Sequence, residues 1–349
     1  MSQAAVQALP RVPAIRRRLA LTLLIFGVAT LAVLVLAPLV GSSHIDLARV
    51  FDPSIPFAAN PDAQIFFIAR LPRVLAAALV GCALATAGVV FQALLRNPLA
   101  SPDTLGISAG AALGAIIAIT FNLQIRALGL TAVPVASFLG AIFALAIVYG
   151  LSVARRQGLS TNVLLLAGVT LSAFFAALIL FVQFMADFTE TFRTVRWLMG
   201  DLDVAGYAPI VAAAPLVLIA LVAFAWLPRP LNLLSLGTDA AAARGVDVER
   251  AQQVALVSAS LATGAAVALA GPIGFVGIIV PHLVRLLVGP DHRLVLPASA
   301  LFGAMFLVLC DLVARTVLAP AQLPVGIITA ILGGPFFLWL LLRHSSVWR

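Results

Sequence analysis

The 349-residue sequence contains no lysine, so its 21 basic residues are all arginines. A nucleotide-binding P-loop needs a lysine to hold the β- and γ-phosphates of the nucleotide. The missing lysine therefore excludes a Walker A site from this chain. If ATP drives the protein, ATP and its magnesium ion bind to another subunit.

Charge and cysteine are also scarce. Charged residues make up 10% of the chain and hydrophobic residues 63%, and the mean hydropathy of +1.15 is far above that of soluble domains. The two cysteines lie in separate apolar runs, and the four histidines form no metal-binding pair. The net charge of +8 does not indicate a nucleic-acid partner, because the arginines are scattered between apolar runs. We therefore expect a membrane protein with no bound metal or cofactor of its own.

Ten apolar segments have the length needed to cross about 30 Å of hydrocarbon, roughly 20 residues each. They predict an all-α polytopic membrane protein, with a ten-span domain over 19–343 and short tails at 1–18 and 344–349. The predicted spans are 19–40, 64–95, 104–122, 131–154, 161–185, 206–227, 251–270, 274–289, 294–316 and 324–343. The first run is too long for a signal peptide and no Ala-x-Ala cleavage site follows it, so we interpret it as a span.

Three features depart from a simple series of spans. A short helix, too polar to cross, is predicted at 189–199, and a polar, alanine-rich insert occupies 231–249. The eighth span is short and follows Gly271-Pro272-Ile273-Gly274, so we expect it to begin part-way into the membrane.

The arginine distribution predicts the orientation. Ten spans put both termini on one side, and that side, which includes the 231–249 insert, receives 14 of the 21 arginines. Because cytoplasmic loops are enriched in Lys and Arg, we expect both termini in the cytoplasm. Arg70, Arg73 and Arg315 then lie at the outer, periplasmic side of the membrane, where the rule does not predict arginines. Two explanations stay open: docking of an acidic external partner, or helix-end anchoring and pairing with Asp311.

One motif could be mistaken for a catalytic site. Residues 106–110, GISAG, match the G-x-S-x-G nucleophile motif, but that motif needs a strand-to-helix turn and here it opens a membrane helix. We interpret Gly106, Gly110 and Gly114 instead as two overlapping G-x-x-x-G units that let a neighbouring helix approach closely. A hydrolase acting through Ser108 is the alternative.

Intramembrane carboxylates are nearly absent. Asp311 is the one carboxylate well inside a predicted span, and Arg315 follows it one helical turn later on the same face. A carrier coupled to protons or sodium ions would show more intramembrane charge. This scarcity weakens the interpretation as an ion-coupled secondary transporter without excluding it.

The fifth predicted span presents a bulky apolar face. Phe174, Leu178, Phe181 and Met185 recur at helical spacing. Such a face suits a wide, apolar passage for a large planar or macrocyclic solute, and it equally suits lipid contact or a bundle core.

Long, ordered motifs then indicate a family. They are RLPR at 70–73, GCALATAGVVFQAL at 81–94, NPLASPDTLGISAGAALG at 97–114, and further matching segments at 155–169, 231–246, 271–293 and 311–343. Together they closely resemble the permease subunits of bacterial ABC importers for iron chelates, haem and vitamin B12. The resemblance covers roughly 64–343.

The resemblance implies the type II importer fold in the bacterial inner membrane. It also implies a homodimer with the passage on its two-fold axis, two ATP-binding subunits on the cytoplasmic side and a periplasmic substrate-binding protein above. Within this frame it assigns Arg70, Arg73 and Arg315 to binding-protein docking. It assigns contact with the ATPase to the coupling helices of the insert, through Leu231, Leu234, Leu236, Gly237, Ala240, Ala243 and Gly245.

The resemblance also assigns residues along the passage. Asn97, Leu99, Thr161 and Asn162 would line the cytoplasmic gate, and the fifth span with Phe174, Leu178, Phe181 and Met185 would wall the path. The expected cargo is a ferric siderophore or haem, with cobalamin as the alternative within the family.

Overall fold

Ten apolar helices form the body of the protein. The computed structural model describes residues 12–124, 131–153, 161–204 and 206–344, and these residues contain helices and no strands. Seven of the described helices are long and apolar enough to cross a membrane, and three shorter apolar helices complete the set. The ten are α1 (Val12–Leu36), α4 (Leu71–Leu94), α5 (Ile107–Thr120), α6 (Ala132–Val153), α7 (Thr161–Phe184), α9 (Ala208–Trp226), α12 (Val248–Ala270), α13 (Val276–Val288), α14 (His292–Thr316) and α15 (Val325–His344).

Each predicted span corresponds to one of these helices, so the predicted all-α, ten-span fold is confirmed. Two helix starts differ most: α4 begins at Leu71, after a π-helical turn, where the span was predicted from 64, and α1 begins at Val12, inside the predicted tail 1–18. Arg16, Arg17 and Arg18 continue the helix with exposed side chains. The rest of that tail and most of the tail at 344–349 lie outside the described residues. With 13 residues, α13 is about 20 Å long, which is short for a span, as its glycine-rich start predicts.

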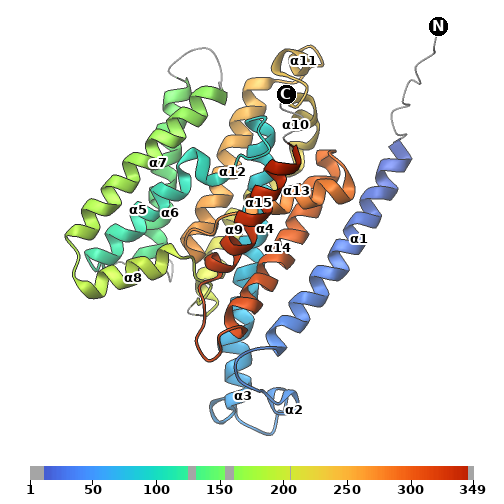
Figure 1. The fold of residues 1–349 in the computed structure, drawn as a ribbon. Helices are drawn as coiled ribbons and strands as arrows, with labels where there is room; N and C mark the ends of the chain where they lie inside the picture. The colour runs from blue at the N-terminus through green and yellow to red at the C-terminus, as the bar shows by residue number, and fades with distance from the viewer. Residues whose placement is uncertain (1–11, 125–130, 154–160, 205, 345–349) are drawn as a thin grey trace.

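Helix α4 lies at the centre of the bundle because it is built largely of small residues. It contacts α9, α12, α13 and α14, while α1 flanks α14 on one side and α5, α6 and α7 form a separate layer on the other (Figure 1). Gly81 lies against the backbone of Gly303 in α14, and Gly88 lies against the backbone of Gly277 in α13. A side chain at any of these glycines would separate the helices, so close backbone approach holds the centre together.

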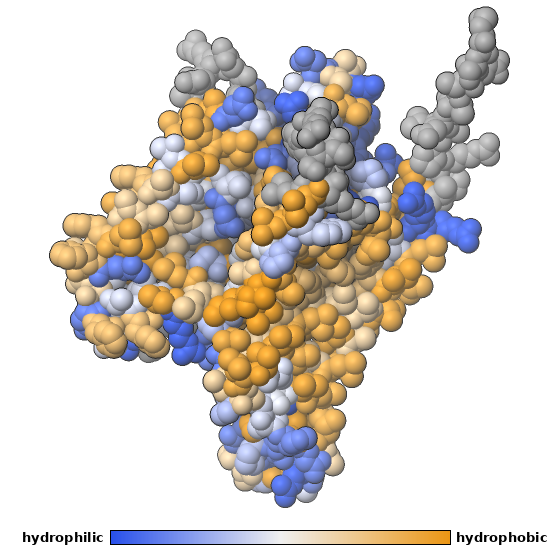
Figure 2. All heavy atoms as spheres, in the orientation of Figure 1, coloured by the Kyte–Doolittle hydropathy of each residue, from blue (hydrophilic) through white to orange (hydrophobic). Residues whose placement is uncertain are grey.

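The surface has the polarity of a membrane protein. Figure 2 shows hydrophobic residues over the flank of the bundle, with hydrophilic residues gathered towards its two ends. Large apolar side chains on this flank, such as Leu24, Ile25 and Leu31 of α1, are more than half exposed. Exposed apolar area of this extent is stable in lipid and not in water.

Short helices mark the two ends of the bundle. One end carries α2 (Leu47–Val50) and α3 (Pro61–Gln64), and the opposite end carries α10 (Pro228–Leu234) and α11 (Thr238–Ala242) (Figure 1). Helix α1 begins and α15 ends at the α10–α11 end, as an even number of spans requires. The polar helix predicted at 189–199 is α8 (Phe188–Leu198), whose first turn is capped by the Asp187 carboxylate.

Candidate transport path and partner surfaces

The three arginines predicted for docking converge at the α2–α3 end. Pro72 has no backbone N–H to donate, and the turn just before it, Ile65–Arg70, is π-helical. From the first turn of α4, Arg73 reaches Asp311 of α14, with Nε 2.8 Å from Oδ1 and 3.1 Å from Oδ2. Its Nη1 also donates to Oε1 of Gln322 at 2.5 Å.

Arg70 and Arg315 hold the chain segment 37–43, which follows α1. Arg70 donates from Nη1 to the carbonyls of Pro38 and Leu39 at 3.1 Å each, and from Nη2 to the carbonyl of Ser43. Arg315 donates from Nη2 to the carbonyl of Ala37. Its Nε lies 3.7 Å from Asp311 Oδ2, too far for a hydrogen bond.

These arginines are buried, so they do not form an exposed patch at the end of the bundle. Arg70, Arg73 and Arg315 are only 5%, 6% and 4% exposed. Pairing with Asp311, the second explanation left open above, is therefore present. The arginines also line a polar hollow of about 210 Å³, together with Ser43, Asp203, Gln322 and four other residues. The docking role itself stays a prediction.

The insert at the opposite end divides into a buried anchor and an exposed tip. Leu231 and Leu234 of α10 are 0% and 3% exposed, so they pack inside this chain and are not free to grip a partner, as was predicted for them. The reason is that they lie one turn apart on the face of α10 that packs on α4 and α14. Leu236 follows α10 and is 62% exposed.

The residues around the tip shape its turns. Gly237, with φ +115°, and Gly245, with φ +79°, adopt backbone conformations that side chains disfavour. Ala243 is exposed and Ala240 is half-buried. The glycines thus let the chain reverse direction tightly around α11.

The predicted gate residues lie at the α10–α11 end. Asn97 follows α4 and its Oδ1 accepts a hydrogen bond from the Leu99 backbone N–H at 2.9 Å, which fixes the turn. Thr161 and Asn162 open α7, and Asn162 is exposed. The two segments meet indirectly, because the chain after Leu99 forms η4 (Pro102–Leu105), which packs on α7.

One face of α7 is open along its whole length. Phe174, Phe181 and Met185 are 57%, 62% and 58% exposed, and Leu178 is half-buried beside them. At the α10–α11 end the same helix borders an open hollow of about 690 Å³. Its lining is Leu151, Asn162, Val163, Leu166, Ala167, Thr170, Leu171 and Phe174. One gate residue and one path residue therefore share a single apolar hollow.

The three glycines of the G-x-x-x-G units lie at helix contacts. Gly110 and Gly114 face backbone carbonyls of α6, and Gly106, with φ +76°, turns the chain into α5 next to Gly168 of α7. Such close contact is what the glycine spacing predicts. Ser108 is buried in this packing, 8% exposed.

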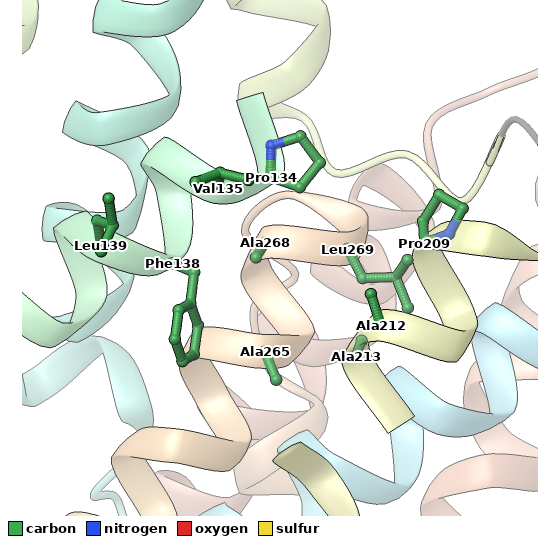
Figure 3. Close-up of a pocket in the computed structure, with 10 residues that line it drawn as sticks. All are labelled: Pro134, Val135, Phe138, Leu139, Pro209, Ala212, Ala213, Ala265, Ala268 and Leu269. Atoms are coloured by element: carbon green, nitrogen blue, oxygen red, sulfur yellow. The ribbon is translucent and has the colours of Figure 1, made fainter. Parts of the chain in front are cut away.

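A further cleft lies among α6, α9 and α12 (Figure 3). It has about 190 Å³, and its ten lining residues are alanines, prolines, leucines, a valine and a phenylalanine. No hydrogen-bonding side chain lines it, so it offers nothing to orient a polar chelate. In the described residues, no group of three or more His, Cys, Asp and Glu side chains is arranged to hold a metal ion.

Sequence reasoning missed the partners of the arginines other than Asp311. Gln322 and the backbone carbonyls of the 37–43 segment are far from Arg70 and Arg73 in sequence, and nothing in the spacing relates them. It also missed Asn232, which links α10 to the start of α14 through Asp291 and His292. The one available signal was an asparagine among the leucines of this short helix.

Comparison with known proteins gives consistent matches. The profile of the FecCD transport family matches residues 29–343. The hemin transport system permease protein HmuU of Yersinia pestis is 42% identical over 285 residues, 81% of this chain and 84% of that protein. The cobalamin import system permease protein BtuC of Halobacterium salinarum is 44% identical over 297 residues, 84% of this chain and 78% of that protein.

A solved structure agrees with these sequence matches. An inward-facing conformation of a protein assigned to the metal-chelate type of ABC transporters has a TM-score of 0.81 and 33% sequence identity to this chain. The match covers 93% of this chain and 99% of that one. The likeness therefore extends over the whole helical body.

Proposed function

This chain belongs to the FecCD transport family, and from that premise we propose that it is the permease subunit of an ATP-driven importer that brings a ferric siderophore or haem into the cytoplasm. The relatives described above are a hemin permease, a cobalamin permease and a metal-chelate type ABC transporter, and with the apolar helices of this chain they support a place in the bacterial inner membrane. The reaction is transport and not catalysis, so no residue needs to act as an acid, base or nucleophile.

The α10–α11 insert is the observation that carries this proposal. A permease that lacks a Walker A lysine needs a surface through which a separate ATPase can move it. The insert supplies such a surface, because Leu231 and Leu234 fasten it to the bundle while Leu236 and Ala243 point outward. We assign contact with two ATP-binding subunits, one for each protomer of a homodimer, to the exposed part of the insert alone.

The polar hollow lined by Arg70, Arg73 and Arg315, called here the arginine hollow, suits the periplasmic binding protein. Three arginines and Asp203 line it, and Asp311 pairs with Arg73 beside it, so positive charge is in excess. An acidic side chain of a periplasmic binding protein would be attracted to this excess of positive charge and could form charge-assisted hydrogen bonds with the guanidinium groups. Charge pairs of this kind fix the orientation of a partner more than they add affinity.

The open face of α7 suits the passage. A homodimer that brings two such faces around one axis would line a wide channel with Phe174, Phe181 and Met185. Such a channel offers the cargo few polar groups, so the cargo would bind weakly. Weak binding would not stabilise one conformation of the permease over the other. Asn97, Leu99, Thr161 and Asn162 would close its cytoplasmic end.

The working cycle then follows from these surfaces. The loaded binding protein docks over the arginine hollow and releases its cargo into the passage. ATP draws the two ATPase subunits together, and the insert shifts the packed helices between two arrangements. Both termini and the insert face the cytoplasm in this arrangement.

Uptake into proteoliposomes tests the proposal. The permease is reconstituted with its neighbouring ATPase and binding protein, and haem, a ferric siderophore and cobalamin are offered in turn. We expect uptake of haem or the siderophore that requires both ATP and the binding protein. Uptake driven by a proton or sodium gradient without the ATPase would instead establish a secondary carrier.

Cobalamin is the second candidate cargo. The cobalamin relative from Halobacterium salinarum and the hemin relative from Yersinia pestis match this chain at 44% and 42% identity, so similarity does not separate the two cargoes. ATP-dependent uptake of cobalamin alone in the same assay would change the cargo and leave the importer mechanism intact.

A further inference from the structure

A polar junction connects the insert to α14. The side chain of Asn232, in α10, lies against Asp291 and His292 at the start of α14. Its Nδ2 donates to Asp291 Oδ1 at 2.7 Å, and its Oδ1 accepts from the backbone N–H of His292 at 3.0 Å. His292 Nδ1 also lies 2.7 Å from the same Oδ1. One amide thus makes three contacts with two consecutive residues.

The contacts determine the chemistry of each group. A carboxylate can only accept and a backbone N–H can only donate, so the Asn232 amide is oriented in one way. Its Oδ1 is an acceptor, and His292 Nδ1 must therefore carry a proton to donate to it. Asp291 Oδ1 also caps α14 by accepting from the Arg293 backbone N–H at 3.0 Å. The junction is thereby built into the first turn of α14.

Helix α14 joins this junction to the arginine cluster at the opposite end. It has 25 residues, a length of about 37 Å, and its last turns carry Asp311 and Arg315. Asp311 pairs with Arg73 of α4, and Arg315 holds the carbonyl of Ala37. A displacement of α10 that α14 follows would therefore reach the residues around the predicted docking hollow.

We infer that Asn232 is a positioning residue for energy coupling, which makes α14 follow the insert when the ATPase moves it. The inference rests on the proposed importer function. Leu231 and Leu234 keep α10 on the bundle by apolar packing, which tolerates sliding. The three directional contacts of Asn232 specify one position of α10 relative to α14, and they carry its movement to that helix.

A swap of two side chains tests this role. In Asn232→Asp, a second carboxylate would face Asp291 and repel it. In Asp291→Asn, the remaining carbonyl oxygen can still accept from both Asn232 and the Arg293 N–H. In the double variant N232D/D291N, the amide at 291 can donate to the carboxylate at 232, which still accepts from the His292 N–H. The net charge and the contacts between residue 232 and residues 291 and 292 are then kept, while the cap on the Arg293 N–H is given up. Ser235→Ala removes an exposed hydrogen bond to the backbone carbonyl of Asn232 but leaves the three contacts of the Asn232 side chain in place, so it is the matched control.

The measured quantity is cargo imported per ATP hydrolysed, in proteoliposomes with the ATPase and binding protein. We expect N232D to hydrolyse ATP but import at least about tenfold less per ATP, while D291N and S235A stay close to wild type and the double variant recovers. Recovery by the double variant supports the role even where N232D alone assembles poorly with the ATPase.

Two results would overturn the inference. One is an unchanged import-to-hydrolysis ratio in N232D beside an active wild type. The other is a defect that the double variant does not repair. A wild-type complex without ATP-dependent uptake would be a different failure, because it would overturn the proposed function and the coupling role with it.

Discussion

The two ends of the bundle are held together by different means. At the α2–α3 end, buried guanidinium groups pair with Asp311, Gln322 and backbone carbonyls. At the α10–α11 end, a neutral amide and two buried leucines fasten a segment whose outer residues remain exposed. Buried charges tolerate little rearrangement, because a lost partner leaves an unpaired charge in a medium of low dielectric constant. The comparison therefore distinguishes a firm end, held by buried charges, from an end whose outermost residues are exposed.

Replacing Arg73 with alanine should have the largest effect. Asp311, which is 0% exposed, would lose its closest partner, and breaking a buried pair in this way costs about 3–5 kcal/mol. We expect a marked loss of thermal stability, measured on the detergent-solubilised protein by the loss of its size-exclusion peak on heating. Arg196→Ala is the control, because its pair with Asp201 is largely exposed and worth about 0–1 kcal/mol. Equal melting temperatures for the two variants would contradict the firm-end interpretation.

Replacing Gly114 with leucine should come next, because it disturbs the helix packing between the two ends. A side chain here meets the backbone carbonyl of Ala136 in α6, which cannot move aside as a flexible side chain could. Overpacking typically costs about 1–3 kcal/mol. Gly27→Leu is the matched control, since nothing lies within 4 Å of a side chain at that position. The same heating assay should separate the two, and similar stability would count against close packing of α5 and α6.

Substitutions at two nearby leucines should distinguish the part of the insert that anchors it to the bundle from the part that contacts the partner. Leu234→Ala removes a buried side chain, and we expect partial detachment of α10, seen as faster proteolysis at the insert. Leu236→Ala removes an exposed one, so proteolysis should not change while the amount of copurifying ATPase falls several-fold. If Leu236→Ala left the copurifying ATPase unchanged, the exposed tip would not be the contact surface.

Replacing Ser108 with alanine should have the smallest effect. This serine is buried at the start of α5, and the change removes one oxygen atom from a helix that has no strand before it. Uptake per ATP should match that of the wild type. Loss of activity with normal stability would revive the hydrolase interpretation.

Much of the fold could be predicted because the bilayer restricts it. Each apolar run between polar breaks became one helix, and the glycines at 106, 110 and 114 lie where helices approach closely. Pairing with Asp311 could be proposed from the sequence. The contacts of Arg73 with Gln322 and of Arg70 with the carbonyls after α1 could not, because these partners are 249 and 31 or 32 positions away. The exposure of single leucines was equally out of reach, since Leu234 and Leu236 differ in burial only through the way α10 ends.

The scarcity of reactive side chains makes the chain suited to site-specific labelling. It has no side-chain amine, so reagents that target lysine would modify its partners and spare its own side chains. Cys82 and Cys310 lie within α4 and α14, where Cys82 is half-buried and Cys310 is buried. A cysteine introduced at the exposed Ala243 would therefore be the one water-facing thiol among the described residues, and a probe attached there would report the motion of the insert alone.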